Sequence, residues 1–551
     1  MLRRTAVLTL FLCALLAGAA SARVRQAPAP ATSFVFVGHG YGHGIGMSQY
    51  GALGYAQHGF TYPQILAHYY PGTTLGPAPA ATLRVLLAEG KKALTVGSAA
   101  PFSVRDGAGA VHALAAGSYR FGPSLVLAAA APSAAGSPTP APSADPGLTG
   151  PLLFVPAAAP LELGGKAYRG RLRAIVAPTG LEAVNVVGLE GYLYGVVPSE
   201  MPYIWPADAL EAQAVAARAY ALATRKQTGD FDVYGDVRSQ AYGGIGAEHF
   251  ETTAAVDRTR GQVVLYRGKV ATTFFYSSSG GRTAAIQDAW PKAARVPYLV
   301  SVSDPYDTLS PWHTWGPVMV TGATLRKALK LSAPVLDLTV TPGAAGRAAS
   351  VLVTDVLGGQ ATVAADTLRG LLGLRSTWFS VGVLSLGVAE SPVVYGSGAD
   401  LSGVVRGLAA PTLQQRLAGG AWLPAGPVAP DATGAFQLTE SPLASTDYRL
   451  VSGKAIGAPV HVAVAPLVTL AALPGSAGLG GTVQPLLMGA TVGLQQQVGT
   501  AWTTVTTATV DASGAFEAVF PLQAGAVYRA RVAPGQGFAV GVSEPLSSGT
   551  P

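Results

Sequence analysis

The sequence predicts an α+β protein whose C-terminal part is entirely β. Hydrophobic residues make up 49% of the 551 residues, and the 69 glycines and 41 prolines favour many short strands and turns over helical bundles. One long helix is predicted at about 207–226, where apolar and small side chains recur at helical spacing. A β-rich pattern repeats after residue 390. A chain of this length is expected to form several domains, each with its own core.

Residues 1–22 are predicted to be a secretory signal peptide. Arg3 and Arg4 precede an apolar run from Ala6 to Ala17, and small residues follow at 20–22, as a signal peptidase requires. The run is short for a bilayer span, and no later segment offers about 18 uninterrupted apolar residues, so no transmembrane span is expected in the mature chain. We therefore expect a protein that is secreted or held in the cell envelope, with residues 23–33 as a flexible tether.

The single cysteine, Cys13, lies inside the predicted signal peptide. The mature chain is therefore expected to contain no disulfide and to depend on burial for its stability. Lipidation at Cys13 is not expected, because the preceding Leu12 is not the small residue that lipoprotein processing requires. The formal net charge is +7, but the basic residues are scattered and form no run typical of a nucleic-acid-binding arm, so no nucleic-acid partner is expected.

The main domain is predicted to span residues 34–384. Two predicted strands, at 83–87 and 172–176, flank a low-complexity segment at about 128–160 that is rich in Ala, Pro, Ser and Gly. We expect this segment to be a mobile insertion within one domain, because the strands on either side of it look like parts of the same unit.

The C-terminal part contains a sequence repeat. Leu413 and two glutamines recur near Leu494, and each unit carries an Asp-Ala-x-Gly-Ala-Phe turn that predicts a hairpin leading into a strand. We predict two small all-β modules, each an Ig-like sandwich, at 391–468 and 469–548. Six residues recur 80 positions later: Trp422, Asp431, Gly434, Phe436, Tyr448 and Arg449 become Trp502, Asp511, Gly514, Phe516, Tyr528 and Arg529.

The two tryptophans of this repeat have two interpretations. The simpler one is that Trp422 and Trp502 are core residues of their modules. The alternative is that one ring is exposed and stacks on a sugar. The modules are expected to be spacers or wall-binding accessories in either case.

Glu200 is the main catalytic candidate. It follows a Gly-Val-Val-Pro-Ser stretch and is predicted to lie in a turn before the long helix, in a chain with only 12% charged residues. Burial raises the pKa of a carboxyl group towards the range that a proton donor needs. The apolar side chains expected to wall it are Val197, Pro198, Met201, Pro202, Tyr203 and Trp205.

A helix N-terminus would act against that role. Pro206 suits the first helical position, and a carboxyl group just before a helix is stabilised as the charged form. Glu200 as a proton donor, as a helix cap, or as the partner of Arg218 all remain open from spacing alone. Arg218 lies deep in an apolar stretch and needs an anionic or carbonyl partner.

A glycine-rich segment at 38–51 is the second candidate element. Its alternating glycines allow a close backbone approach to a ligand, and its polar side chains are His39, His43, Gln49 and Tyr50. We expect these four to contact substrate. Structural hydrogen bonding is one alternative, and a zinc site is another, although a His-x3-His pair without a clear third ligand is a weak metal signal.

Three polar clusters follow the long helix. Each of them alone is compatible with an ordinary solvated turn, and none resembles a nucleophile elbow. The third, at 303–315, offers aromatic rings that could stack on a sugar. The first two supply the further substrate-binding candidates, which are Arg238, Gln240, Tyr242, Ser277, Ser278, Ser279 and Arg282, with Asp236 beside them.

Several of these segments match motifs of one protein family. The matching stretches are 188–202 (GLEGYLYGVVPSEMP), 211–220 (EAQAVAARAY), 238–244 (RSQAYGG), 276–283 (YSSSGGRT), 304–307 (DPYD), 372–379 (LGLRSTWF) and 40–52 (GYGHGIGMSQYGA). With them the chain resembles the SpoIID/LytB family, named for stage II sporulation protein D and an amidase modifier. In that family the glycine-rich segment usually ends the domain, whereas here it comes first. The resemblance therefore implies a circular permutation, with residues near Phe34 and Val381 as neighbours in space.

The resemblance implies an enzyme that acts on peptidoglycan. Sporulation protein D members are lytic transglycosylases on glycan strands stripped of stem peptides, and Glu200 matches their catalytic glutamate. It would protonate the bond between MurNAc and GlcNAc and then, as a base, help the muramic acid close a 1,6-anhydro ring. Arg218 and Tyr220 would hold Glu200 or the sugar. LytB-type members are described as amidase enhancers, so the alternative is a non-catalytic peptidoglycan-binding partner of a cell-wall amidase. No cofactor is implied.

Overall fold

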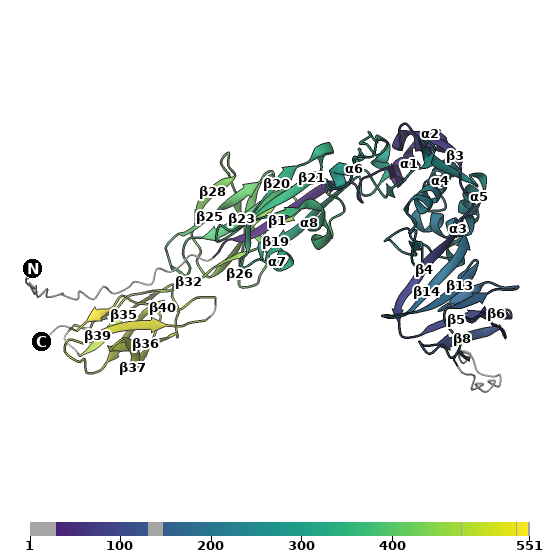
Figure 1. The fold of residues 1–551 in the computed structure, drawn as a ribbon. Helices are drawn as coiled ribbons and strands as arrows, with labels where there is room; N and C mark the ends of the chain where they lie inside the picture. Colours follow the sequence, from purple (N-terminus) through teal and green to yellow (C-terminus); the bar gives the residue numbers. More distant parts are fainter. Residues whose placement is uncertain (1–28, 130–146, 475–476, 536, 549–551) are drawn as a thin grey trace, which may run out of the picture. The chain divides into compact units, whose positions relative to one another are not determined.

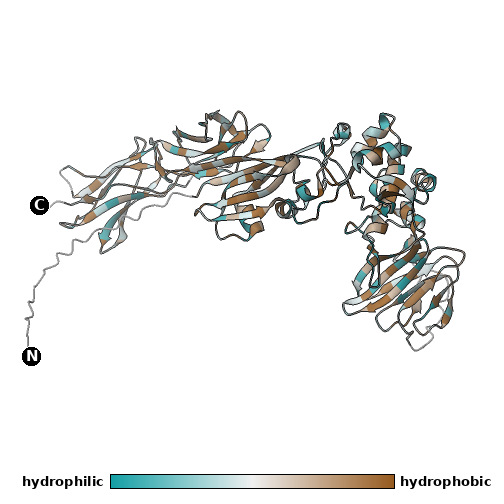
Figure 2. Ribbon diagram, turned by 45° about the horizontal axis from the view of Figure 1, so that its top comes forward, coloured by the Kyte–Doolittle hydropathy of each residue, from teal (hydrophilic) through white to brown (hydrophobic). Residues whose placement is uncertain are grey.

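The computed structural model describes residues 29–129, 147–474, 477–535 and 537–548 (Figure 1). The predicted signal peptide, with Cys13, lies outside the described residues. The chain divides into two compact units, one spanning 34–382 and the other comprising the residues after 382 together with those before 34. Helices and strands are mixed as the α+β prediction requires. Figure 2 shows apolar and polar residues alternating along many strands, as expected where one face is buried.

Two sheets, antiparallel except for the parallel pairing of β15 with β4, form the β part that carries the predicted strands at 83–87 and 172–176. β14 (Gly180–Gly188) lies between β4 (Thr82–Lys91) and β13 (Arg171–Ala177), so both predicted strands belong to one sheet. The full order of this sheet is β15 (Val233–Tyr234), β4, β14, β13, β10 (Leu152–Val155), β6 (Phe102–Arg105) and β7 (Val111–Leu114). The second sheet has the order β12 (Lys166–Tyr168), β11 (Leu161–Leu163), β5 (Leu94–Ser98), β8 (Gly117–Phe121) and β9 (Ala128–Ala129).

The predicted insertion at 128–160 is partly wrong. β10 falls inside it and pairs on both sides, with β13 and β6, and Leu152 and Phe154 are fully buried. The composition hid this strand because its short apolar core is flanked by proline- and alanine-rich sequence. Residues 130–146 of the predicted insertion lie outside the described part of the chain.

Five helices lie together beside the β4–β14 sheet (Figure 1). Side chains of α3 and α4 share one hydrophobic core with β4, for example Val196, Leu210 and Val85. In the part of the chain that the structure describes, none of the helices has the length and apolarity needed to cross a membrane. The helices are α1 (Gln49–Gln57), α2 (Tyr62–Tyr69), α3 (Leu189–Glu200), α4 (Ala207–Thr224) and α5 (Phe250–Arg258). α4 agrees with the helix predicted at about 207–226.

The N-terminal strand joins segments that are distant in sequence. β1 (Ala31–His39) lies between β19 (Thr314–Thr321) and β23 (Phe379–Val388), and the backbone N–H of His39 donates to the Trp378 carbonyl at 2.9 Å. The expected proximity of residues near Phe34 and Val381 is therefore confirmed. The predicted tether at 23–33 is too long, because Thr32 and Ser33 are buried strand residues.

A separate three-stranded sheet follows β19 in the sequence. It consists of β20 (Val335–Pro342), β21 (Ala348–Asp355) and β22 (Gln360–Ala364), with the helices α7 (Gly322–Leu329) and α8 (Ala365–Leu372) at its ends. Beyond β1, the glycine-rich segment pairs β2 (Met47–Ser48) in parallel with β18 (Phe275–Tyr276).

The C-terminal unit is built from strands. β25 (Ala399–Arg406) pairs with β23 and with β28 (Ala435–Glu440), and β26 (Thr412–Leu417) pairs with β27 (Leu423–Pro427) and β29 (Thr446–Ser452). Farther along, the same pairing recurs between β35 (Gly478–Gln484) and β38 (Ala515–Val519), and between β36 (Thr491–Val498), β37 (Ala501–Thr509) and β39 (Val527–Val532).

Trp422 and Trp502 are half-buried and are not core residues. The guanidinium of Arg449 lies 4.0 Å from the ring centroid of Trp422, and that of Arg529 lies 4.2 Å from the ring centroid of Trp502. The interpretation as core residues is therefore wrong. The physical reason is that an arginine at the same offset packs over each ring, which hydrophobic patterning does not reveal.

Candidate functional site

Glu200 is the last residue of helix α3 rather than part of a turn. The buried residues Leu189, Tyr192, Leu193, Val196 and Val197 recur at the i, i+3, i+4, i+7 spacing of one helical face. Pro198 lies inside the helix without ending it at that point. The sequence prediction of a turn was wrong because the glycines and Pro198 of this stretch were given more weight than its apolar period.

Two hydrogen bonds hold the Glu200 carboxyl group. The backbone N–H of Ala241 donates to Oε1 at 2.9 Å, and Gln49 Nε2 donates to Oε2 at 3.4 Å. Gln49 is the first residue of α1, and it is buried. The glycine-rich segment therefore reaches Glu200 across 151 positions of sequence.

Burial dominates the electrostatics of Glu200. It raises the pKa of the carboxyl group above its usual value, and the hydrogen bonds from Ala241 and Gln49 oppose this only in part. The C-terminal end of α3 adds a second influence in the same direction, because the helix dipole disfavours a negative charge there. A carboxyl group in this position keeps its proton to higher pH than an exposed glutamate and can act as a proton donor.

Tyrosine and glutamine side chains close to Glu200 have polar atoms without partners. Burial raises the pKa values of Tyr192 and Tyr220, and the nearby charge of Glu200 raises them further. Among the described residues, Tyr192 Oη and Gln240 Oε1 are buried and have no hydrogen-bond partner. Gln240 Nε2 donates to the Ala217 carbonyl at 3.2 Å. Each polar group that is buried without a partner in this way costs about 1–3 kcal/mol.

Comparison with known proteins finds a family model that is similar to the segment around this site. Residues 177–266, which include Glu200, Tyr192, Tyr220 and Ala241, match the family model described as stage II sporulation protein, SpoIID. This segment is SpoIID-like.

Sequence relatives agree with that family. An uncharacterized protein of Brachyspira hyodysenteriae is 38% identical over 143 residues, which is 25% of this chain and 38% of the relative. The amidase enhancer of Bacillus subtilis is 38% identical over 120 residues, covering 22% of this chain and 16% of its own length. Stage II sporulation protein D of Bacillus amyloliquefaciens is 34% identical over 151 residues, 24% of this chain and 43% of its own. The chain thus spans less than half the length of these relatives.

In the SpoIID-like region Arg218 holds the helices and does not reach Glu200. Its guanidinium is fully buried and donates to both carboxylate oxygens of Glu190, at 2.7 and 3.1 Å. It also donates to the carbonyls of Gln262 and Val256. The predicted need for an anionic and carbonyl environment is met, but Glu190 provides it. A direct contact of Arg218 with a sugar is inconsistent with this burial.

Two further predicted sugar ligands are also structural. Tyr242 is buried, and its hydroxyl donates to Asn185 Oδ1 at 2.8 Å. Its ring packs against Gly195 of α3, where an added Cβ would lie 2.8 Å from Tyr242 Cε2. Arg238 is exposed and pairs with Asp236 and Glu89 at the surface. The remaining residue of that cluster, Gln240, is buried and donates to the Ala217 carbonyl, and the next residue, Ala241, is the one whose backbone N–H binds Glu200.

The serine cluster is organised by Asp307, a residue that the sequence analysis did not select. The Asp307 carboxylate is fully buried and accepts from Ser48 Oγ and Ser278 Oγ, both at 2.8 Å, and from the backbone N–H groups of Ser279 and Gly280. Ser278 and Ser279 are therefore bound internally and are not free to contact substrate. The signal was present, because Asp307 ends the DPYD motif.

The remaining candidates have contacts of other kinds. The Ser277 carbonyl accepts from the backbone N–H of Tyr50 at 3.0 Å, and the Tyr50 ring packs 5.1 Å from that of Trp205. Arg282 is exposed. Tyr203, expected to wall Glu200, instead stacks on His249 at 3.9 Å between ring centroids.

His39 and His43 have different surroundings. The His43 ring lies among Phe274, Tyr276 and Trp290, and burial with nearby arginines lowers its pKa to about 4. His39 lies instead beside Trp378. Within the described ranges, no three His, Cys, Asp or Glu side chains come together as a metal site. The two histidines therefore do not fit a shared zinc ion.

Proposed function

We propose that this protein is a peptidoglycan lytic transglycosylase with Glu200 as its acid and base. The observation that carries the proposal is a carboxyl group at the end of α3 whose pKa is raised by burial and whose oxygens are held by Ala241 and Gln49. Export to the cell envelope belongs to the same proposal. The SpoIID-like identity of residues 177–266 supports it.

The reaction needs only one carboxyl group. Protonated Glu200 donates its proton to the oxygen that links MurNAc to GlcNAc, and the bond from the muramic acid C1 to that oxygen breaks. The carboxylate then removes the proton of the C6 hydroxyl of the same sugar, whose oxygen bonds to C1 and closes the 1,6-anhydro ring. No water is consumed. In the described part of the chain, none of the groups that shift the pKa of Glu200 is a second carboxylate, in keeping with this scheme.

The neighbouring polar groups suit a sugar substrate. Gln49 and Ala241 orient the carboxyl group by their hydrogen bonds to its two oxygens. Tyr220 contributes a half-buried ring close to Glu200. In this proposal Tyr220, Gln240, Gln49 and Tyr50 are the predicted ligands that remain near the substrate.

A second function is favoured by the 38% identity to a protein named amidase enhancer. In that case the chain binds peptidoglycan without cleaving it and acts on a cell-wall amidase as its partner. Glu200 would then be an inherited group with no catalytic role.

Mass spectrometry of products from peptide-free glycan strands tests the proposal. The wild type should release fragments with 1,6-anhydro-muramic ends, and Glu200→Gln should be slower by about 100-fold or more, because general acid–base catalysis contributes roughly 10²–10⁴-fold. Glutamine preserves the shape and can still accept from Ala241. The matched control is Glu251→Gln at an exposed position of α5, which should cleave normally. Equal glycan binding by both proteins without any cleavage would instead favour the amidase-enhancer function.

A further inference from the structure

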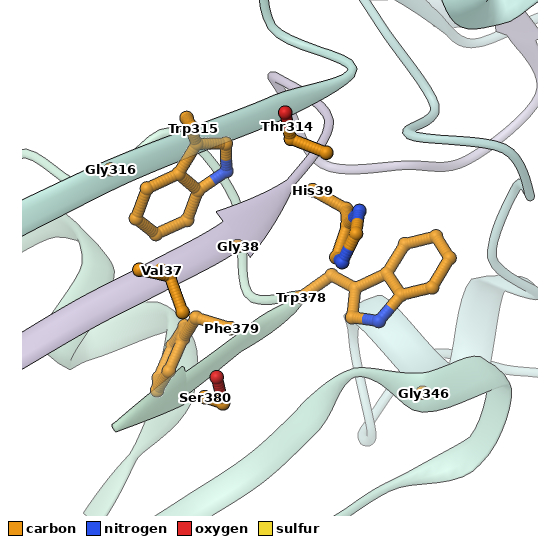
Figure 3. A pocket seen from close by; sticks show the side chains of 10 residues that line it. All are labelled: Val37, Gly38, His39, Thr314, Trp315, Gly316, Gly346, Trp378, Phe379 and Ser380. Carbon is orange, nitrogen blue, oxygen red and sulfur yellow. The ribbon is translucent and has the colours of Figure 1, made fainter. Parts of the chain in front are cut away.

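A cavity of about 460 Å³ opens beside β1, β19 and β23, in the same unit as Glu200 (Figure 3). Its size falls within the roughly 300–1,000 Å³ range of small-ligand pockets. It is distinct from the candidate catalytic site, because neither Glu200 nor its partners Gln49 and Ala241 line it. The residues used below are His39, Trp315, Trp378, Gly38 and Gly346.

Aromatic rings form much of its wall. The His39 and Trp378 ring centroids are 4.9 Å apart, and Figure 3 shows His39 between the rings of Trp315 and Trp378. Trp378 is half-buried, so part of its ring remains open to a ligand. Flat aromatic faces of this kind pack well against the C–H face of a pyranose ring.

The cavity carries no acidic, lysine or arginine side chain in its lining. Its one titratable group is His39, whose pKa is lowered by burial and by the neighbouring His313. The imidazole is therefore neutral near pH 7. The Arg347 guanidinium lies 5.9 Å from the Trp378 ring centroid, but it is buried and does not line the cavity. A neutral ligand with hydroxyl groups therefore fits the lining itself.

Two ring nitrogens at the cavity lack hydrogen-bond partners. Trp315 is only 7% exposed, and across the residues that the structure describes its Nε1 and the Nδ1 of His39 are buried without a partner. A buried N–H left unpaired costs about 1–3 kcal/mol. A hydroxyl group entering beside the rings would supply the missing acceptor for Trp315 and a donor or acceptor for His39.

Glycines shape the cavity around these rings. An added Cβ at Gly38 would lie 2.4 Å from Trp315 Cζ2, and one at Gly346 would lie 2.8 Å from Trp378 Nε1. Gly346 also has a φ of +77°, which disfavours other residues. Both tryptophans are thus seated in positions that only glycine permits.

We propose that this cavity binds one neutral pyranose unit of a glycan strand, outside the Glu200 site. Trp378 stacks on the sugar ring, and Trp315 Nε1 and His39 Nδ1 bind its hydroxyl groups. The choice of a peptidoglycan strand as the natural ligand rests on the proposed function, but sugar binding by the cavity does not. Its role is to hold a strand independently of the bond being cleaved.

Indole N–H signals in an NMR spectrum of ¹⁵N-tryptophan-labelled protein test the proposal. The seven tryptophans give seven such signals, assigned by single Trp→Phe substitutions. The Glu200→Gln chain is titrated with the linear tetramer of N-acetylglucosamine, so that no cleavage interferes. The signals of Trp315 and Trp378 should move as the tetramer saturates the protein.

Two variants make the result decisive. Trp378→Ala should bind the tetramer through this cavity about tenfold more weakly, as judged by the Trp315 signal, whereas Trp378→Phe should lose less. The unchanged signals of the distant tryptophans report that the fold is intact. Movement confined to Trp205 beside Tyr50, or to Trp422 and Trp502, would overturn the proposal, as would no movement at all. Because the cleavage assay is separate, loss of this pocket and loss of the proposed catalytic function are distinguishable.

Discussion

Glu190 lies in the first turn of α3 and Glu200 is its last residue, and their surroundings differ. Glu190 lies in the first turn of α3, where the dipole favours a negative charge, and it is paired with Arg218. Glu200 lies at the other end, where the dipole disfavours charge, and no cation among the described residues forms an ion pair with it. Glu190 is thus the structural partner of Arg218, whereas burial raises the pKa of Glu200.

The raised pKa of Glu200 makes stability depend on pH. Below the pKa of the unfolded state the carboxyl group is protonated in both the folded and the unfolded state, so it does not change the free energy of unfolding. As pH rises from there through the higher folded pKa, the unfolded chain releases its proton first, so the free energy of unfolding falls. Glu200→Gln removes this loss and should therefore raise the melting temperature relative to wild type at pH 7, but not at pH 4.

Thermal unfolding of both proteins at the two pH values measures this effect. Glu251→Gln serves as the control for loss of an exposed carboxylate and should show no such pH-dependent gain. A Glu200→Gln gain of the same size at pH 4 and pH 7 would contradict the effect of burial on Glu200.

Arg218 links three elements around helix α4. From α4 it binds Glu190 at the start of α3, the Val256 carbonyl in α5 and the Gln262 carbonyl at the start of β16 (Gln262–Tyr266). These contacts fix how α3 packs on α4, and hence where Glu200 lies. Arg218 therefore positions α3 and does not make the substrate contact that was predicted for it.

Replacing Arg218 with methionine should lower the free energy of unfolding by about 3–5 kcal/mol, because it leaves the Glu190 carboxylate without its buried partner. The double variant Arg218→Met with Glu190→Leu should recover much of that loss, since neither charge then remains. Denaturant unfolding provides the measurement. Arg326→Met, at an exposed position of α7, is the control and should change stability by less than about 0.5 kcal/mol. A double variant as unstable as the single one would contradict the ion-pair explanation.

At the scale of the whole molecule, the candidate site and the last strands belong to different units. Glu200 and its contacts lie within 34–382, whereas the residues from Val468 to Val532 form a core of their own. Just before this core begins, β32 (Val464–Ala465) pairs with the earlier strand β24 (Val393–Val394).

A chain ending at Ala465 should therefore retain the proposed activity. We expect its rate on soluble peptide-free glycan to stay within about twofold of the full chain, because the deleted residues have a separate core. The release of anhydro-muramic ends measures this, with Glu200→Gln in the shortened chain as the blank. A tenfold loss of rate in a shortened chain that still unfolds cooperatively would show that the proposed activity depends on the deleted strands, and would contradict this prediction.

The sequence by itself determined the local features of this protein. The helix at 207–224 and the strands β4 and β13 follow from apolar periods and residue types. The motif order also predicted correctly that the segments at Phe34 and Val381 are neighbours.

Only the tertiary structure decided which partners these residues have. In the folded chain Arg218 forms an ion pair with Glu190, a serine donates to Asp307, and Gln49 donates to Glu200. It also assembled His39, Trp315 and Trp378 into one cavity. The physical reason is range: the period of a helix or strand is set by neighbours within a few residues, whereas hydrogen-bond partners 28 to 259 positions apart depend on how whole elements pack.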